Sequence, residues 1–379
     1  MHWVFITGAY PPHPGGLADY TAVLAKELAR HGDAVTVVTG PLDSTRLPVA
    51  QGVQVLTLVD HFGRRGLTQL DHFLAGLSAP CQLFVQYVPQ ALGPRRSSRF
   101  RGLPLTFAWW LRQRQGAPVW TMFHEAKVMA PPGSGIARNG LSLVTEQMLA
   151  WTARASQRIF VAMNAWEPHI ARHLTAGQRV EYLPIPSNVA TQVDPSARDR
   201  TRANLLNGHA RAIVGHFGTF SSEVTGLIEP LLRHSIAEHP ERQIHLVGDG
   251  SREFAGRLPP EAAHLVTATG RLEAEAVAQH LSACDLMVQP FPDGASTRRG
   301  SIMAGLALGV PVVSNLGRAS EVIWQQEKAL GLASDQQSLA SVVDALLANP
   351  HERHALGARG QSLYEKHFSL AHTLSVLRD

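Results

Sequence analysis

The first forty residues carry the pattern that most constrains the fold of this chain. Residues 3–7 form a short apolar run, residues 8–16 are rich in glycine and proline, and residues 17–28 repeat apolar side chains at helical spacing. A second apolar run, at 35–39, does not alternate with polar residues, which is typical of a strand covered on both faces. The order strand, loop, helix, strand predicts a βαβ unit with parallel strands.

Further apolar runs continue this order along both halves of the chain. Strands are predicted at 53–58, 83–87, 118–123 and 158–162 in the first half, and at 212–216, 243–247, 265–267, 286–289 and 310–314 in the second. The second half opens as the first does, with an apolar strand that enters a glycine-containing loop. The sequence therefore predicts the α/β class, with two Rossmann-like domains whose parallel sheets face a central cleft.

A polar, charged stretch over residues 190–210 separates the two halves, which places the boundary near 185–205. The expected organisation is an N-terminal domain over 1–185, a linker over 186–205 and a C-terminal domain over 206–365. Residues 366–379 are predicted to form a final helix that could return to the N-terminal domain.

Composition narrows the class of protein. The chain has 379 residues, so two domains are expected, and its 45% hydrophobic and 17% charged residues are typical of a globular protein. The two cysteines form neither a disulfide framework nor a metal-ligand pattern, which favours a reducing cytoplasm. The N-terminus lacks a signal-peptide pattern, and no apolar run reaches the ~18 residues of a membrane span.

The segment from Asp293 to Ser301, DGASTRRGS, is the strongest chemical feature. It lies between a predicted strand and an apolar helix over 302–308, with Arg298 and Arg299 beside the helix start and Gly300-Ser301 opening it. Guanidinium groups and the amides of a helix N-terminus together bind pyrophosphate without a metal. The alternative is a solvated arginine pair capped by Ser301.

Gly15-Gly16 precedes the first predicted helix, where glycine lets a phosphate approach the backbone. The alternative is a turn that needs a positive φ. The sequence contains neither the G-x-G-x-x-G fingerprint nor a P-loop, so nicotinamide-dependent and ATPase activities lose their main support.

His124-Glu125 follows the predicted strand at 118–123. A histidine there could bond a sugar hydroxyl or transfer a proton, with Glu125 orienting it or meeting the acceptor; the alternative is a loop histidine satisfied by backbone. The sequence HEAKV is not the H-E-x-x-H of zinc proteases, and no Asp-x-Asp pair occurs to hold a divalent ion on a diphosphate. No metal site is expected.

The segment from Arg95 to Gln115 has six arginines interleaved with phenylalanine and tryptophan. This pattern suits an anionic membrane surface or a lipid-linked acceptor. The favoured alternative is an amphipathic helix whose aromatic side chains pack in the core. No recognised nucleic-acid-binding module accompanies the segment, so no nucleic-acid partner is expected.

These residues resemble those of the GT-B glycosyltransferases, in particular the retaining group called family 4. The N-terminal YPPHPGGLADY (10–20) is similar to the donor-side glycine loop of that family, and His124 matches its histidine after the fourth strand. In the second half, the resemblance lies in HLVGDGS (245–251), ATGRLEAEAVAQHLSACDLMVQPF (268–291) and GVPVVSNLGRASEVI (309–323).

The chain departs from that family at two places. The family usually has two glutamates eight positions apart, and Ser296 and Ala304 stand there in this sequence. The family's basic pair after the first C-domain strand is also absent from GHFGTFSSEVTG. We expect Arg298 and Arg299 to stabilise the leaving group instead, with Gly218, Thr219, Ser296 and Thr297 in the donor site, as in sub-groups that have Ser-Thr-Arg-Arg.

The resemblance implies transfer of a sugar from a nucleoside diphosphate sugar to an acceptor hydroxyl, with retention of anomeric configuration and no cofactor or metal. The products would be glycans, glycolipids or glycosylated metabolites, made by a cytoplasmic protein that could associate with the inner membrane face. Two alternatives stay open: a nucleotide-sugar epimerase on the same fold, and an inactive two-lobed protein that only binds nucleotide sugars.

Overall fold

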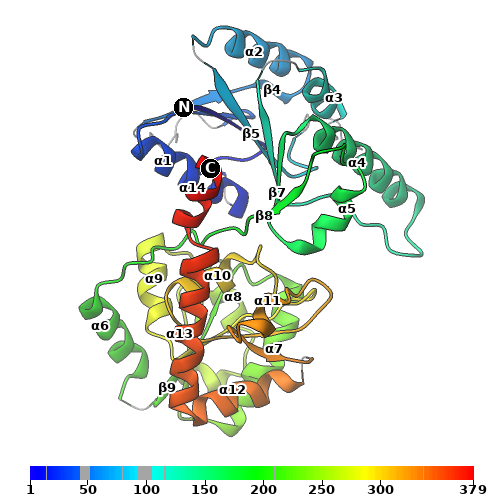
Figure 1. The fold of residues 1–379 in the computed structure, drawn as a ribbon. Coiled ribbons are helices and arrows are strands. Elements are labelled where there is room, and N and C mark those ends of the chain that lie inside the picture. Colours follow the sequence, from blue (N-terminus) through cyan, green and yellow to red (C-terminus); the bar gives the residue numbers. More distant parts are fainter. Residues whose placement is uncertain are drawn as a thin grey trace. The chain divides into compact units, whose positions relative to one another are not determined.

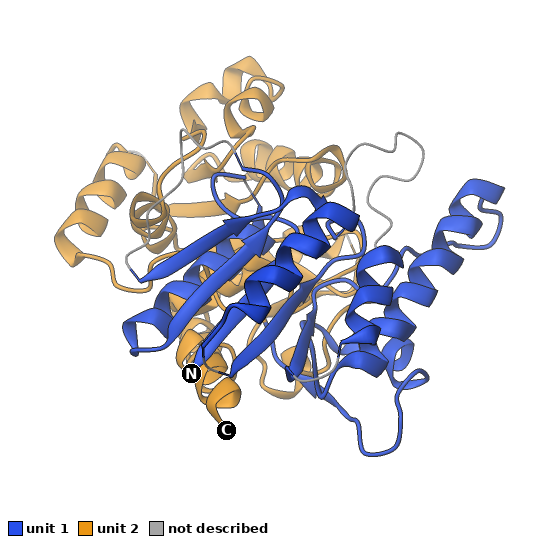
Figure 2. Ribbon diagram, turned by 90° about the horizontal axis from the view of Figure 1, so that it is seen from above, with its two compact units in different colours: residues 1–184 blue, residues 185–379 orange. Residues whose placement is uncertain are grey.

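The computed structural model describes residues 1–13, 15–42, 52–78, 80–92, 105–114, 117–208, 210–335 and 337–379. Contacts divide the chain into two compact units, Met1–Pro184 and Ile185–Asp379 (Figure 2). Each unit is built on one parallel β-sheet with helices packed against it (Figure 1). The predicted α/β class and the two Rossmann-like sheets are therefore confirmed.

The sheet of the first unit has seven strands in the order β3-β2-β1-β5-β6-β7-β8, and all neighbouring pairs are parallel. Its strands are β1 (His2–Thr7), β2 (Ala34–Thr39), β3 (Val53–Thr57), β5 (Cys81–Tyr87), β6 (Val119–Phe123), β7 (Arg158–Val161) and β8 (Val180–Tyr182), and β4 (Val59–Phe62) precedes α2. Its helices are α1 (Gly16–Arg30), α2 (Arg64–Ala75), α3 (Leu105–Gln113), α4 (Ile136–Ala155), the 3₁₀ turn η2 (Asn164–Trp166) and α5 (Glu167–Ala171).

Successive residues of these strands point to opposite faces of the sheet, and both faces are buried. On one face, Val4 and Ile6 join a core cluster that includes side chains of α2, α3 and α4. On the other face, Trp3 contacts Phe84 and Trp120 through ring edges. Burial on both faces explains the continuous apolar runs in the sequence.

The sheet of the second unit has six parallel strands in the order β11-β10-β9-β12-β13-β14. These strands are β9 (Ala212–Phe217), β10 (Arg242–Val247), β11 (Val266–Ala268), β12 (Leu286–Val288), β13 (Val312–Asn315) and β14 (Gly331–Ala333). The helices are α6 (Pro195–Leu206), α7 (Ser222–Glu238), α8 (Ser251–Ala255), η3 (Pro260–Leu265), α9 (Ala274–Ser282), α10 (Gly300–Ala307), α11 (Ile323–Gln326), α12 (Ser338–Ala348), α13 (Pro350–His367) and α14 (Leu370–Arg378).

Alternate strand residues of this sheet enter two different cores. Ile213 and Met287 belong to a cluster with side chains of α6, α9, α10 and α13. Their neighbours in the strands, Val214 and Leu286, point to the other face and pack with side chains of α7 and α12. The sheet is therefore the middle layer of three, and its loops at the strand ends are the parts left to bind ligands.

The polar stretch between the two sheets contains α6. Asp194 caps this helix by accepting a hydrogen bond from the Ser196 amide (3.0 Å), and Pro195 occupies the first turn, where its missing N–H costs nothing. The division by contacts falls after Pro184 and groups α6 and α14 with the second unit.

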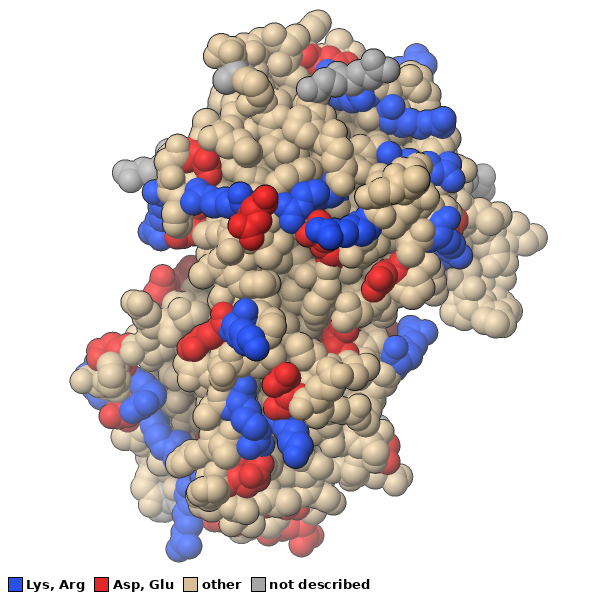
Figure 3. All heavy atoms as spheres, viewed as in Figure 1, with Lys and Arg blue, Asp and Glu red and all other residues tan. Residues whose placement is uncertain are grey.

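The surface carries charges of both signs. On the face in Figure 3, basic and acidic side chains are mixed over both units. Among the described residues, the helices fall short of the length and apolarity that crossing a membrane requires.

Candidate functional site

Three neighbouring strands of the second sheet bring their following loops to one edge. β9, β12 and β13 are adjacent and parallel, so the segments after Phe217, Val288 and Asn315 all lie at the carboxyl edge. In open α/β sheets this is the edge at which ligands bind.

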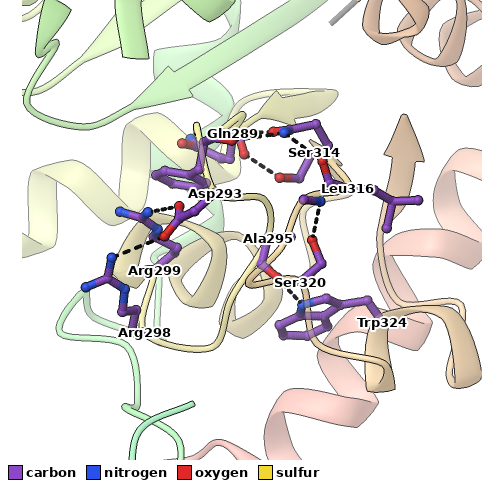
Figure 4. A network of polar contacts seen from close by, with 12 residues as sticks. Gln289, Asp293, Ala295, Arg298, Arg299, Ser314, Leu316, Ser320 and Trp324 are labelled. Atoms are coloured by element: carbon purple, nitrogen blue, oxygen red, sulfur yellow. Dashed lines mark hydrogen bonds and ion pairs between the residues drawn. The ribbon is translucent and has the colours of Figure 1, made fainter. Parts of the chain in front are cut away.

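The loop after β12 is fixed by side chains of β13. The Asn315 side chain accepts from the Phe291 amide (2.8 Å) and donates to the Phe291 carbonyl (2.9 Å), which imitates one more rung of the sheet. The Ser314 hydroxyl donates to the Gln289 carbonyl (2.6 Å). These bonds continue the strand pairing into the loop, and Figure 4 shows the one between Ser314 and Gln289.

The next part of this loop packs against the backbone of the loop after β13. Gly294 has a φ of +88°, and a Cβ built on it would lie 2.3 Å from the Ser320 hydroxyl oxygen. The buried indole of Trp324 donates to the Ala295 carbonyl (2.9 Å), and the Ala319 amide donates to the Asp293 carbonyl (2.8 Å). The loop is therefore held in one conformation before it reaches the arginines.

Arg298 and Arg299 share the carboxylate of Asp293 (Figure 4). The Arg298 guanidinium donates to Asp293 Oδ2 (3.3 Å), and that of Arg299 donates to Oδ1. The Arg299 guanidinium also lies over the Phe291 ring, 4.3 Å from its centroid. All three charged side chains are mostly buried, with 28%, 23% and 16% exposed for Arg298, Arg299 and Asp293.

The two arginines of this cluster lie in a partly desolvated place. Burial and the adjacent Arg298 lower the pKa of Arg299, and Asp293 opposes that effect. The Nε of Arg299 is buried and has no acceptor among the residues that the structure describes. Guanidinium groups bind phosphate through paired N–H donors, and two of them lie side by side here.

Helix α10 begins immediately after the arginines, at Gly300. The amides of Ile302 and Met303 donate to the Arg299 carbonyl (3.0 and 3.1 Å). The first amides of a helix have no partner within it, so those of Gly300 and Ser301 add donors and partial positive charge beside the guanidinium groups. The predicted helix start at Gly300-Ser301 is confirmed.

Ser296 and Thr297 are fully buried, at the positions where the sequence analysis expected donor contacts. The Thr297 hydroxyl donates to Glu321 Oε1 (3.2 Å), a buried carboxylate 24 residues further along the chain. The Ser296 hydroxyl has no hydrogen-bond partner within the described part of the chain. Ala304 is a residue of α10, and its side chain is buried in the apolar core.

The end of β9 adds Gly218, exposed Thr219 and a histidine that sequence reasoning missed. The imidazole of His216 donates from Nδ1 to the Val288 carbonyl (2.7 Å), and its Nε2 has no partner among the described residues. Burial lowers the pKa of His216 to about 4 despite that bond, so the ring is neutral at pH 7. In the sequence, this histidine stands alone within an apolar run, so no motif marked it as a candidate site residue.

Gln289 is a second missed residue, fully buried at the end of β12. When its amide is oriented to satisfy its neighbours, it accepts from the Phe217 amide (2.9 Å) and donates to the Phe217 carbonyl (3.1 Å) and the Ser301 hydroxyl (3.0 Å). Gln289 thus ties the end of β9 to the first turn of α10.

The remaining predicted residues gather at the carboxyl edge of the sheet in the first unit. His124 follows β6, and its backbone amide donates to the Tyr87 carbonyl (3.1 Å), as does that of Glu125 (3.5 Å). The His124 Nε2 bonds Gln86 Oε1 (2.7 Å), and its ring meets Tyr20 of α1 edge-on at 5.3 Å. Burial lowers the pKa of His124 to about 3.

Gly15 and Gly16 lie at the start of α1, near the same edge. Gly15 is the N-cap with a φ of +140°, both glycines are exposed, and a Cβ on either would meet no atom within 4 Å. Open space in front of a helix N-terminus is what phosphate or sugar binding there needs. The predicted site residues therefore form one group in each unit.

The described part of the segment from Arg95 to Gln115 is α3; residues 95–104 and 115 lie outside the described residues. Phe107 and Trp110 of α3 are buried, and Trp110 donates from its indole to Asp71 (2.9 Å). Trp109 is 55% exposed. A hollow of about 550 Å³ between α2 and α3 is lined by Arg64, Leu67, Thr68, Asp71, Thr106, Trp109 and Trp110.

Comparisons with known proteins bear on the fold and on the class of protein. Residues 211–349 match the family described as "Glycosyl transferases group 1". The chain is also 32% identical over 145 residues to a GDP-mannose-dependent monoacylated alpha-(1-6)-phosphatidylinositol monomannoside mannosyltransferase of Corynebacterium glutamicum; the match covers 35% of this chain and 37% of that protein. Together they support a glycosyltransferase.

Solved structures show the same fold over the whole length. Sucrose-phosphate synthase of Thermosynechococcus elongatus superposes with a TM-score of 0.73 at 18% identity, over 100% of this chain and 98% of that one. Anabaena HepE in complex with UDP and glucose superposes with a TM-score of 0.66 at 17% identity, over 99% and 100%. The predicted GT-B fold is therefore confirmed.

Proposed function

We propose that this chain transfers a sugar from a nucleoside diphosphate sugar to an acceptor hydroxyl, with Arg298 and Arg299 binding the diphosphate of the donor. The observation that carries the proposal is the cluster of Asp293, Arg298 and Arg299 directly before α10, at the ligand-binding edge of the sheet. The family match over 211–349 covers all of these residues.

The geometry suits a diphosphate better than a neutral sugar. Two guanidinium groups offer paired N–H donors that match phosphate oxygens, and the α10 amides add further donors nearby. Arg299 is stacked on Phe291 and anchored by Asp293, so one side of its guanidinium is already fixed before a ligand arrives. Preorganised charge of this kind is effective because it need not reorient during the reaction.

In the reaction, the bond between the anomeric carbon and the β-phosphate oxygen breaks, and its electron pair leaves with the nucleoside diphosphate. The acceptor oxygen forms the new bond to that carbon and gives up its proton to the departing β-phosphate oxygen. Negative charge grows on the β-phosphate during this step, and Arg298 and Arg299 stabilise it in place of a divalent metal, by about 3–4 kcal/mol per well-placed donor. Retention of configuration follows the family that the sequence resembles.

His124 would act as a neutral hydrogen-bonding group. Its low pKa makes it a poor proton donor at pH 7, and its Nε2 is engaged by Gln86. Nδ1 is then left as an acceptor for a sugar hydroxyl. Glu125 follows it on the chain and is the candidate to meet the acceptor substrate.

A lipid-linked acceptor fits two observations. The Corynebacterium relative is named as acting on a phosphatidylinositol mannoside, and the first unit here exposes Trp109 with Arg64, Arg65 and Arg112 of α2 and α3. An exposed tryptophan beside basic residues binds anionic lipid surfaces. We infer peripheral association of a cytoplasmic protein with a membrane.

The diphosphate proposal is tested by calorimetric titration of the purified chain with GDP and with UDP. Arg298→Ala combined with Arg299→Ala should lose at least about 100-fold in affinity, since each charge-assisted contact contributes ~1.5–3 kcal/mol. Arg233→Ala, which removes an exposed arginine of α7, is the matched control. Unchanged affinity in the double variant would overturn the phosphate role.

Incubation with GDP-mannose and with UDP-glucose separates the remaining alternatives. Glycosyl transfer to added lipid or sugar acceptors supports the proposal. An epimerised donor in the absence of acceptor would show an epimerase, and tight binding without transfer or hydrolysis across an acceptor panel would show an inactive binding protein. His124→Gln should lower the transfer rate while leaving GDP and UDP affinity unchanged.

A further inference from the structure

Two histidines and a carboxylate converge at the amino edge of the second sheet, the edge opposite the candidate donor site. His234 lies in the last turns of α7, His239 directly follows that helix, and Asp344 lies on α12, which packs against α7. Their ligand atoms lie within 4.8 Å of one another. Because Arg242, which contacts this group, is the first residue of β10, the group lies at the strand starts.

We propose that His234, His239 and Asp344 bind a transition-metal ion such as Zn²⁺. His234 Nε2 lies 3.0 Å from Asp344 Oδ2, and His239 Nε2 lies 3.4 Å from Oδ1. Two ligand atoms bound tetrahedrally at ~2.0–2.1 Å from zinc lie about 3.3 Å apart. The three candidate ligand atoms, one from each residue, lie within 4.8 Å of one another, so small side-chain rotations would bring them to the distances that an ion needs. Two imidazoles and one carboxylate leave a fourth position to water, as the half-exposed side chains allow.

A second carboxylate lies beside one of the imidazoles. His239 Nδ1 lies 3.3 Å from Glu241 Oε1, and its Nε2 lies 3.4 Å from Asp344 Oδ1. A carboxylate behind a ligating histidine is the usual support of such sites. Arg242, whose side chain is 7% exposed, binds Asp344 Oδ1, the oxygen that His239 also approaches, and so holds that carboxylate in place.

The donor set selects the class of ion. Imidazole nitrogen favours Zn²⁺, Co²⁺ or Ni²⁺, whereas Mg²⁺ and Ca²⁺ prefer sites made of oxygen. Arg242 shares the carboxylate, which weakens Asp344 as a ligand for any cation and leaves the two imidazoles as the stronger ligands. The ion would link α7 to α12 across 105 to 110 residues of sequence, so its effect would be to stabilise the second unit rather than to take part in sugar transfer.

The test is a titration of chelator-treated full-length chain with Zn²⁺, followed by calorimetry and by thermal unfolding. Wild type should bind one equivalent and melt at a higher temperature with Zn²⁺ than without, because binding to the folded state stabilises it. His234→Ala and His239→Ala should each weaken binding at least about tenfold. Glu241→Gln should weaken it by a comparable factor, since loss of a carboxylate that supports a ligating histidine costs about 10–100-fold in metal affinity. Co²⁺ should give a visible spectrum that the same variants remove.

The control accounts for the 19 histidines of the chain. His367 and His372 form another close pair, 6.2 Å between ring centroids, so His367→Ala with His372→Ala should leave the Zn²⁺ affinity unchanged. Wild-type binding in the combined His234→Ala, His239→Ala variant, or no Zn²⁺ binding by wild type, would overturn the proposal. GDP and UDP affinity should stay unchanged in every variant, so this test does not depend on the proposed transferase activity.

Discussion

Asp293 and Arg299 form an ion pair one residue before α10 begins, and this pair fixes a guanidinium at the N-terminus of a helix. The same carboxylate holds Arg298. Asp293 therefore orients two adjacent arginines and, in the absence of ligand, balances part of their charge. A diphosphate that binds there would balance that charge instead.

Replacing Asp293 by asparagine tests this relationship. The variant keeps the size of the side chain but removes the counter-charge that Asp293 supplies to two mostly buried guanidinium groups. We expect its free energy of unfolding to fall by about 1–3 kcal/mol, the range for losing a charged partner. GDP or UDP should restore part of that loss, so the rise in melting temperature on adding nucleotide should be larger for the variant than for wild type.

Asp199→Asn serves as the control, because that carboxylate pairs with Arg198 on the exposed surface of α6. It should change neither stability nor the nucleotide-induced shift by more than about 0.5 kcal/mol. A smaller nucleotide shift in Asp293→Asn than in wild type would show that Asp293 contributes to the ligand contact itself rather than only balancing the arginines.

His216 predicts a pH dependence of stability. Its pKa is about 4 in the folded chain against 6.5 as the ordinary value. Below pH 6.5 His216 is protonated in the unfolded chain, but in the folded chain it stays neutral until about pH 4. The free energy of unfolding therefore falls as the pH drops from 6.5 to 4. For this residue, the loss between pH 7.5 and pH 5 is about 2 kcal/mol.

Urea unfolding of wild type and His216→Asn at these two pH values isolates the contribution. The difference in unfolding free energy between the two proteins should shrink by about 2 kcal/mol at pH 5, because only wild type carries the titrating ring. His351→Gln, at an exposed position of α13, should follow wild type at both pH values. An equal difference at pH 7.5 and pH 5 would contradict the role assigned to His216.

Exposed residues of α2 and α3 predict binding to anionic vesicles. Wild type should sediment with vesicles that contain phosphatidylglycerol and release as salt is raised, since basic residues contribute ~1 kcal/mol each at such a surface. Combined Arg64→Gln, Arg65→Gln and Arg112→Gln should abolish sedimentation at 0.15 M salt, and Trp109→Ala should weaken it. The control is the combined arginine-to-glutamine change at Arg198, Arg233 and Arg257 of the second unit. If this control lost vesicle binding to the same extent, it would contradict a defined membrane-binding face on α2 and α3.

The sequence predicted most of the fold because buried parallel strands read as continuous apolar runs. The runs at 3–7 and 83–87, for example, lie within β1 and β5. The short strands β8 and β14 were not predicted. β8 has the sequence VEY and β14 has GLA, and three residues at a sheet edge show no periodicity that would separate them from a loop.

The candidate site was predictable only where charge or glycine marks it. Arg298, Arg299 and the helix start at Gly300 follow from the local sequence. Asn315, Glu321 and His216 do not, because each acts on a segment distant in sequence: Asn315 on Phe291, Glu321 on Thr297 and His216 on Val288. Such pairs arise from strand order, which composition and spacing do not contain.

Gly294 allows the loop geometry to be tested separately from its charges. Its φ of +88° disfavours any residue with a Cβ, and an added methyl would lie 2.3 Å from the Ser320 oxygen and 2.4 Å from the Gly317 nitrogen. Gly294→Ala should therefore cost about 1–3 kcal/mol of stability, by strain and by displacement of the loop. Gly256→Ala is the control and should be nearly neutral, because Gly256 has an ordinary φ of −65° and an added Cβ would lie 3.6 Å from the Arg252 carbonyl oxygen. Because Asp293 precedes Gly294, the displacement should also lower GDP and UDP affinity although both arginines remain. Loss of stability with wild-type nucleotide affinity would show that the arginines hold the diphosphate without the support of this loop.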